Sequence, residues 1–151
     1  MNKTIKSQIL ESLQNDLKHK IKSSTLEIES ITESRNSDTK SSAGDKFETS
    51  RAMAQMELEK MERALARSTK LLLDLSIINL DKEYKNVEFG SLIITNNGNY
   101  LASFALGKIT IDHIDYYAIS LASPIGQVLM QKMVGDVLSF QGREIIINEI
   151  I

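Results

Sequence analysis

The stretch ASPIGQVLMQKMVGD, residues 122–136, decides the fold of the second half of the chain. Ser123 is a preferred helix N-cap residue. Pro124 suits the first helical position, because its fixed φ matches a helix and no N–H is needed there. Gly135 is a typical residue for the end of a helix. The stretch therefore predicts one short helix that follows Pro124, covers residues 125–133 and ends at Gly135.

Segments with strand-like composition lie on both sides of this helix. The expected strands cover residues 87–95, 99–104, 108–111, 116–120, 136–140 and 143–150. Asn97-Gly98, residues 112–115 and Gln141-Gly142 provide the turns between consecutive strands, and Asn-Gly is a strong hairpin signal. Antiparallel hairpins with one short helix predict a compact α+β domain of roughly 70 residues.

The first half of the chain has a different composition, with no proline and a single glycine. Apolar residues recur mostly four apart at Ile5, Ile9, Leu13, Leu17, Ile21, Ile28 and Ile31. A second series alternates steps of four and three through Ala54, Leu58, Met61, Leu65, Ser68, Leu72 and Leu75. These periods predict two one-faced helices of about 30 residues, each ~45 Å long. Met53, Met56 and Met61 are expected to fill gaps between the helices.

A polar stretch at residues 35–44 separates the two helices and predicts the turn of an antiparallel hairpin. Ser42 followed by Asp45 resembles the capping arrangement of a helix start. An intermolecular coiled coil that uses the same apolar seams is the alternative. The expected domains are a coiled-coil hairpin at 1–78, with its tip near 35–45, and a globular domain at 79–151.

Composition excludes several classes of protein. The formal net charge of −2 and the pI of about 5.7 argue against a surface that is wrapped in nucleic acid. No apolar run approaches the ~18 residues needed to span a bilayer, and the first residues do not resemble a signal peptide, so a cytoplasmic protein without membrane contact is expected. The absence of cysteine excludes disulfides, thiolate metal sites and thiol nucleophiles.

Residues 122–130, followed by 132–136, resemble the C-terminal signature of the GreA/GreB family of transcript cleavage factors. In that signature a Ser-Pro-Ile sequence opens a short helix that ends in Lys-x-Val-Gly-Asp. The first half of the chain agrees with the family in architecture. The resemblance implies an FKBP-like C-terminal domain that docks at the secondary channel of bacterial RNA polymerase through Ser123, Pro124 and Ile125.

The resemblance also assigns a role to the hairpin tip, which in the family reads Asp-x-Lys-Glu-Asn-Ala. Asp38, Lys40 and Ala43 keep three of these positions, but the second acid of the family falls on Ser41. The family's two acids help to hold a Mg²⁺ ion, which prefers hard oxygen ligands. Asp38 and Asp45 are therefore the candidate metal-orienting residues, and Asp45 does not keep the family spacing.

Two functions follow from this resemblance. The chain is either a factor that stimulates RNA polymerase to cleave backtracked RNA, or a regulator that occupies the same channel without causing cleavage. Both imply a monomer with RNA polymerase as its partner, nascent RNA contacted only through the polymerase, and no enzyme activity, stably bound metal or cofactor of its own. Mg²⁺ would be shared with the polymerase active site. A prolyl isomerase and a dimerising coiled-coil adaptor are the remaining alternatives.

Overall fold

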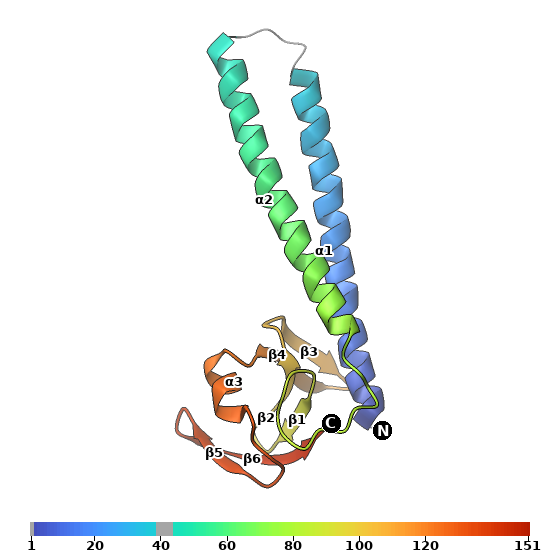
Figure 1. Ribbon diagram of the computed structural model, residues 1–151, viewed down its shortest axis with the longest axis vertical. Coiled ribbons are helices and arrows are strands. Elements are labelled where there is room, and N and C mark those ends of the chain that lie inside the picture. The colour runs from blue at the N-terminus through green and yellow to red at the C-terminus, as the bar shows by residue number, and fades with distance from the viewer. Residues whose placement is uncertain (1, 39–43) are drawn as a thin grey trace. The chain divides into compact units, whose positions relative to one another are not determined.

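The computed structural model describes residues 2–38 and 44–151, with side chains described at 2–36 and 48–151. The elements are α1 (Asn2–Asp38), α2 (Gly44–Ser76), β1 (Leu92–Thr95), β2 (Gly98–Ser103), β3 (Gly107–Ile111), β4 (Ile114–Ser120), α3 (Pro124–Leu129), β5 (Val137–Phe140) and β6 (Arg143–Ile150). The expected fold class, a long helical hairpin followed in sequence by a small α+β domain, is confirmed (Figure 1).

The chain divides into two compact units, and the division runs through both long helices. Asn15–Leu73 forms the hairpin unit, whereas Met1–Gln14 and Asp74–Ile151 together form the sheet unit. The first turns of α1 therefore pack with the sheet, although they are continuous with the helix of the hairpin. The expected division into domains at 1–78 and 79–151 remains a prediction.

In the hairpin unit, α1 and α2 lie side by side and run in opposite directions (Figure 1). The Arg35 guanidinium on α1 donates a hydrogen bond to the Gln55 side-chain oxygen on α2, at 2.9 Å. Leu17 and Leu58 on the predicted seams are buried, and the other seam residues described in this unit are half-buried. The predicted pairing within one chain is thus confirmed. The helices have 37 and 33 residues, so both exceed the expected length.

The sheet unit contains a six-stranded sheet in the order β3-β4-β2-β1-β6-β5. Four of its strand pairs are antiparallel, including the β1–β2, β3–β4 and β5–β6 hairpins that the turn signals predicted. The β2–β4 pair is parallel, with Tyr100 opposite Tyr117. The prediction of a purely antiparallel sheet is therefore wrong at this pair.

Several predicted boundaries are also wrong. β1 begins at Leu92 and not at 87, because the Ser91 hydroxyl donates to the Glu88 carbonyl and closes a turn before the strand, and β4 begins at Ile114, inside the turn expected at 112–115. The turn between β1 and β2 is Asn96-Asn97, and Gly98 is the first residue of β2, because the Thr95 hydroxyl accepts a bond from the Asn97 amide and donates one to the Gly98 carbonyl. Helix α3 ends at Leu129 and not at 133. It cannot continue because Gln131 has a φ of 65°, in the left-handed region.

Both faces of the sheet bury apolar side chains. One face packs with α3 around the fully buried Ile93, Ala102 and Leu129. Because side chains alternate along a strand, Leu92 and Leu101 point to the opposite face, and they are also fully buried. Within the described residues, no helix is long and apolar enough to cross a membrane.

Candidate functional site

The start of α3 is fixed by hydrogen bonds of Ser123. Its backbone is extended, with φ −68° and ψ 160°, and its hydroxyl accepts a bond from the Gly126 amide at 3.2 Å. The same hydroxyl donates to the Ser120 carbonyl oxygen at 2.5 Å. The predicted cap and the proline at the first helical position are both confirmed. The Ser123 hydroxyl is therefore engaged inside the domain.

The three predicted binding residues at this site are adjacent but differ in exposure. Pro124 is exposed, Ser123 is half-buried, and Ile125 is half-buried with its side chain packed against the core. Gly126 behind them is buried, and a Cβ atom added there would lie 2.1 Å from the Ser120 carbonyl oxygen. Pro124 is thus the most exposed of the three predicted residues.

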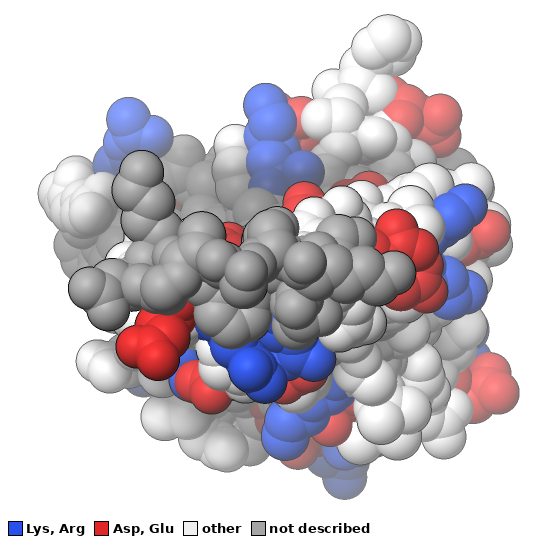
Figure 2. Space-filling model, turned by 90° about the horizontal axis from the view of Figure 1, so that it is seen from above, with Lys and Arg blue, Asp and Glu red and all other residues white. Residues whose placement is uncertain are grey.

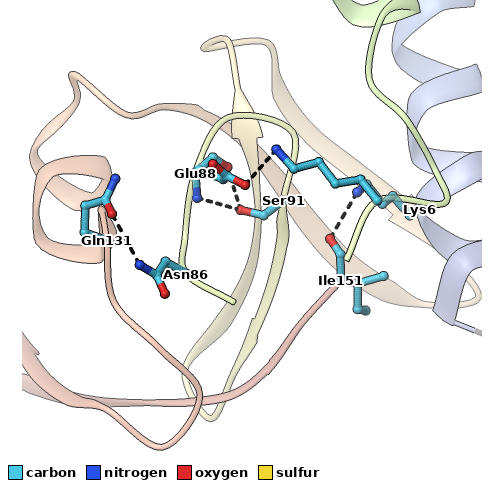
Figure 3. Close-up of polar contacts among 7 residues, drawn as sticks. Lys6, Asn86, Glu88, Ser91, Gln131 and Ile151 are labelled. Atoms are coloured by element: carbon cyan, nitrogen blue, oxygen red, sulfur yellow. Dashed lines mark hydrogen bonds and ion pairs between the residues drawn. The ribbon is translucent and has the colours of Figure 1, made fainter. Parts of the chain in front are cut away.

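The segment after α3 is held by Asn86 and Val87. Gln131 donates its backbone N–H to the Val87 carbonyl at 2.9 Å, and Val87 donates to the Lys132 carbonyl at 2.8 Å. Figure 3 shows the Asn86 and Gln131 side chains facing each other, with the Asn86 amide donating to the Gln131 side-chain oxygen at 3.4 Å. These bonds stabilise the left-handed backbone at Gln131, which directs the chain away from the helix axis.

The turn at 133–136 is also closed by hydrogen bonds. Met133 donates its N–H to the Asp136 carboxylate at 2.8 Å, and the Asp136 N–H donates to the Met133 carbonyl at 3.1 Å. Gly135 donates to the Ile147 carbonyl at 2.8 Å, which ties the turn to β6. The Gly-Asp pair of the signature therefore shapes a turn whose backbone is held by hydrogen bonds.

This fixed segment presents an apolar surface that the sequence reasoning missed as a site. Met130 is 44% exposed, Met133 53%, Val134 56% and Val137 59%. We call these four residues the 130–137 patch. Exposed apolar side chains are ordinary when they are scattered, but four within one hydrogen-bonded segment suit a protein interface. The available sequence signal for this surface was the pair Met133-Val134, directly before the turn residue Gly135.

The hairpin tip lies mostly outside the described residues. Asp38 is the last residue of α1 and Asp45 is the second residue of α2. The predicted tip residues Lys40, Ser41 and Ala43, and the expected cap at Ser42, fall outside the described part of the chain, as do the side chains of both acids. Asp38 was expected in the turn, and its backbone is helical.

The outer face of α2 carries two further features. Met53 and Met56 are 66% and 69% exposed, so the expectation that they fill interhelical gaps is wrong, whereas Met61 is half-buried as expected. Further along the helix, Lys60, Arg63 and Arg67 recur at steps of three and four, are exposed, and line a shallow cavity of about 350 Å³.

The face seen from above in Figure 2 carries interspersed blue and red side chains. The part of this face that belongs to described residues therefore carries charges of both signs.

In the sheet unit, Lys6 on α1 is fully buried. Its ammonium group donates to the Ile151 oxygen at 3.0 Å (Figure 3) and lies 4.3 Å from the centre of the Tyr84 ring. Lys82 approaches the same ring at 4.9 Å and pairs with Glu88 at 2.8 Å. Burial, together with the nearby Lys82 charge, lowers the pKa of Lys6 to about 8.

The lowered pKa of Lys6 predicts a pH-dependent stability. Between pH 8 and 10 Lys6 holds more protons in the unfolded chain, with its ordinary pKa of 10.5, than in the folded chain, so Lys6 should contribute a rise of about 2 kcal/mol to the free energy of unfolding. The raised pKa values of Lys82, Tyr84, Tyr100 and Tyr116 act in the opposite direction towards pH 10, so the contribution of Lys6 is the difference between the wild type and a Lys6 variant. Chemical denaturation at several pH values measures this rise. Lys6→Met should flatten it, and a variant that keeps the full slope would contradict the assignment to Lys6.

Comparison with known proteins gives a limited result. No protein-family model matches the chain, and no curated protein sequence matches it. Among solved structures, the chain is similar to one described as the transcription factor Gfh1, with 20% sequence identity over 91% of this chain and 92% of that chain and a TM-score of 0.35. At this identity and TM-score, function has to be argued from the chain's own residues.

Proposed function

We propose that this chain is a Gre-like transcription factor that binds bacterial RNA polymerase at the secondary channel and modulates its active site. The observation that carries the proposal is the segment from Ser123 to Asp136. It has the Ser-Pro start and the Gly-Asp turn of the family signature, and it exposes Pro124 and the 130–137 patch. Apolar side chains that become buried when a partner binds at such a patch can supply much of the affinity of a protein complex.

The two long helices support the second part of the proposal. Within the hairpin unit, residues 15–38 of α1 and 44–73 of α2 have lengths of about 36 Å and 45 Å, enough for a slender hairpin to enter a channel that excludes a globular domain. The exposed stripe of Lys60, Arg63 and Arg67 suits phosphate groups, because guanidinium and ammonium groups form charge-assisted hydrogen bonds with them. We propose that the hairpin contacts nucleic acid only within the polymerase complex.

The test of docking is the affinity of the full chain for RNA polymerase core enzyme, measured by pull-down and by titration. We expect the wild type to bind and Val134→Asp to weaken binding about tenfold or more, because the interface would bury an unpaired carboxylate. Pro124→Asn should weaken it as well, since an exposed apolar ring is replaced by a polar amide.

Ile114→Asp is the matched control, because Ile114 is 47% exposed but lies at the β3–β4 turn, outside the 130–137 patch. It should bind like the wild type. Equal loss in both aspartate variants would contradict the assignment of the patch, and a wild type that does not bind polymerase would overturn the proposed function.

A transcript cleavage assay on stalled elongation complexes separates the two forms of the proposal. If the chain supports cleavage, Asp38→Asn should lower the cleavage rate by at least about tenfold, because the amide is a poorer ligand for Mg²⁺ than the carboxylate. If Ser41 leaves the tip with too few acids, the wild type should give no cleavage and should instead compete with an active cleavage factor. Cleavage that is unaffected by Asp38→Asn would contradict the catalytic form.

A further inference from the structure

Methionine is the sulfur-containing residue of this chain, which has six methionines and no cysteine. A thioether reacts with hydrogen peroxide to give a sulfoxide, and exposed methionines react before buried ones. Of the five methionines that the structure describes, Met61 is half-buried and four are exposed. The exposed four form two pairs with a spacing of three residues, Met53 with Met56 on α2 and Met130 with Met133 after α3.

The second pair occupies a fixed frame. Met130 donates its N–H to the Gly126 carbonyl at 2.9 Å, and Met133 is held by Asp136. The Met130 and Met133 side chains are 44% and 53% exposed, and the nearby residues Val134 and Val137 in the sequence are also exposed. Oxidation can therefore change the chemistry of the patch while the backbone that supports it keeps its hydrogen bonds.

We propose that Met130 and Met133 form a peroxide-sensitive modification site that weakens docking of the 130–137 patch. This regulatory role rests on the proposed function, because it acts on the same polymerase-binding surface. In the reaction, the sulfur lone pair attacks one peroxide oxygen, the O–O bond breaks and an S–O bond forms. Sulfur is oxidised by two electrons and the other oxygen leaves as water, after proton transfer.

The consequence for binding follows from the polarity of the product. A sulfoxide oxygen is a strong hydrogen-bond acceptor, and its burial in an apolar interface without a donor is unfavourable. Methionine sulfoxide reductases return the thioether, so the change is reversible. The modified chain would remain folded and lose affinity for its partner.

The test treats the full chain with hydrogen peroxide, removes the oxidant, maps the added oxygen atoms by peptide mass spectrometry and measures polymerase affinity. We expect Met130 and Met133 to be oxidised before Met61, and the affinity to fall about tenfold or more. Reductase treatment should restore it. The affinity of a Met130→Leu/Met133→Leu variant should be the same before and after peroxide, whatever its starting value.

A Met53→Leu/Met56→Leu variant should keep the peroxide sensitivity, which separates the two methionine pairs. Oxidation of Met61 before Met130 and Met133, or an oxidised chain that binds as tightly as the untreated chain, would overturn the inference. Failure of the untreated wild type to bind polymerase overturns the proposed function and the regulatory role with it. The mass map in that case still decides whether the modification site exists.

Discussion

Replacing Gly126 by alanine should destabilise the sheet unit by about 3 kcal/mol or more, because the position has no room for a side chain. An added Cβ would lie 2.1 Å from the Ser120 carbonyl oxygen and 2.6 Å from the Leu121 Cα atom. Both atoms belong to the backbone, so they cannot rotate away. The Ser120 oxygen also accepts the bonds that fix the Ser123 cap, so a shift would disturb the start of α3.

Urea denaturation, monitored by tyrosine fluorescence, measures this loss of stability in the sheet unit. The chain has no tryptophan, and its four tyrosines, Tyr84, Tyr100, Tyr116 and Tyr117, all belong to the sheet unit. Gly135→Ala is the control, because Gly135 has a φ of 90° and no atom within 4 Å of an added Cβ. It should lose about 1–2 kcal/mol through backbone strain, less than the loss expected at Gly126. Equal losses in the two variants would show that the close contact at Gly126 is unimportant.

Leu129→Ala should destabilise the same unit by about 2–5 kcal/mol. Leu129 is fully buried, and it joins α3 to a core that includes Ile93 and Ile147. Truncation of the Leu129 side chain removes its apolar contacts with the core and leaves a cavity beneath α3. The midpoint of the urea transition, again by tyrosine fluorescence, measures the effect.

Gln127→Ala on the same helix gives the comparison. Gln127 is exposed, and its side chain donates one hydrogen bond to the Ala122 carbonyl at 3.1 Å. Its loss should lower the free energy of unfolding by less than about 1 kcal/mol. Leu129→Ala with a loss that small would mean that α3 is held by its cap and turn and not by its buried face.

Local chemistry explains why much of the fold could be predicted. Ser123 and Pro124 fix the start of α3 through bonds within a few residues, and the period of apolar residues fixes the paired faces of α1 and α2. The turn at Gln141-Gly142 follows from Gly142, whose φ of 77° suits a glycine. Each of these features depends on neighbours along the chain, so a single sequence carries enough information to predict it.

The features that were missed depend on contacts between distant segments. Gln131 ends α3 early because Val87 and Asn86 hold it, and neither is near it in sequence. β3 lies between β2 and β4 in the sequence, so no turn connects these two strands directly. Turn residues therefore could not predict their parallel pairing. Lysine is normally exposed, but Lys6 is buried because its ammonium group interacts with the Tyr84 ring and the Ile151 oxygen.

The candidate site was predicted in part for the same reason. Sequence resemblance located the Ser123–Ile125 segment, but it could not show that Ser123 bonds within the domain or that Ile125 packs inward. The exposed 130–137 patch arises from the early helix end at Leu129 and the closed turn at Asp136. A longer helix, as the sequence predicted, would have placed Met133 and Val134 differently.

The order of the strands limits the changes in length that the connection at residues 121–136 can accept. The chain leaves β4 near one end of the sheet and enters β5 at the other end, so residues 121–136 must cross four strand spacings, about 19 Å. A deletion or an insertion would change the spacing between the cap at Ser123 and the turn at Asp136, and so shift the outward side chains between them. Related chains with other partners should therefore differ in the identity of outward side chains while the length of this connection stays constant.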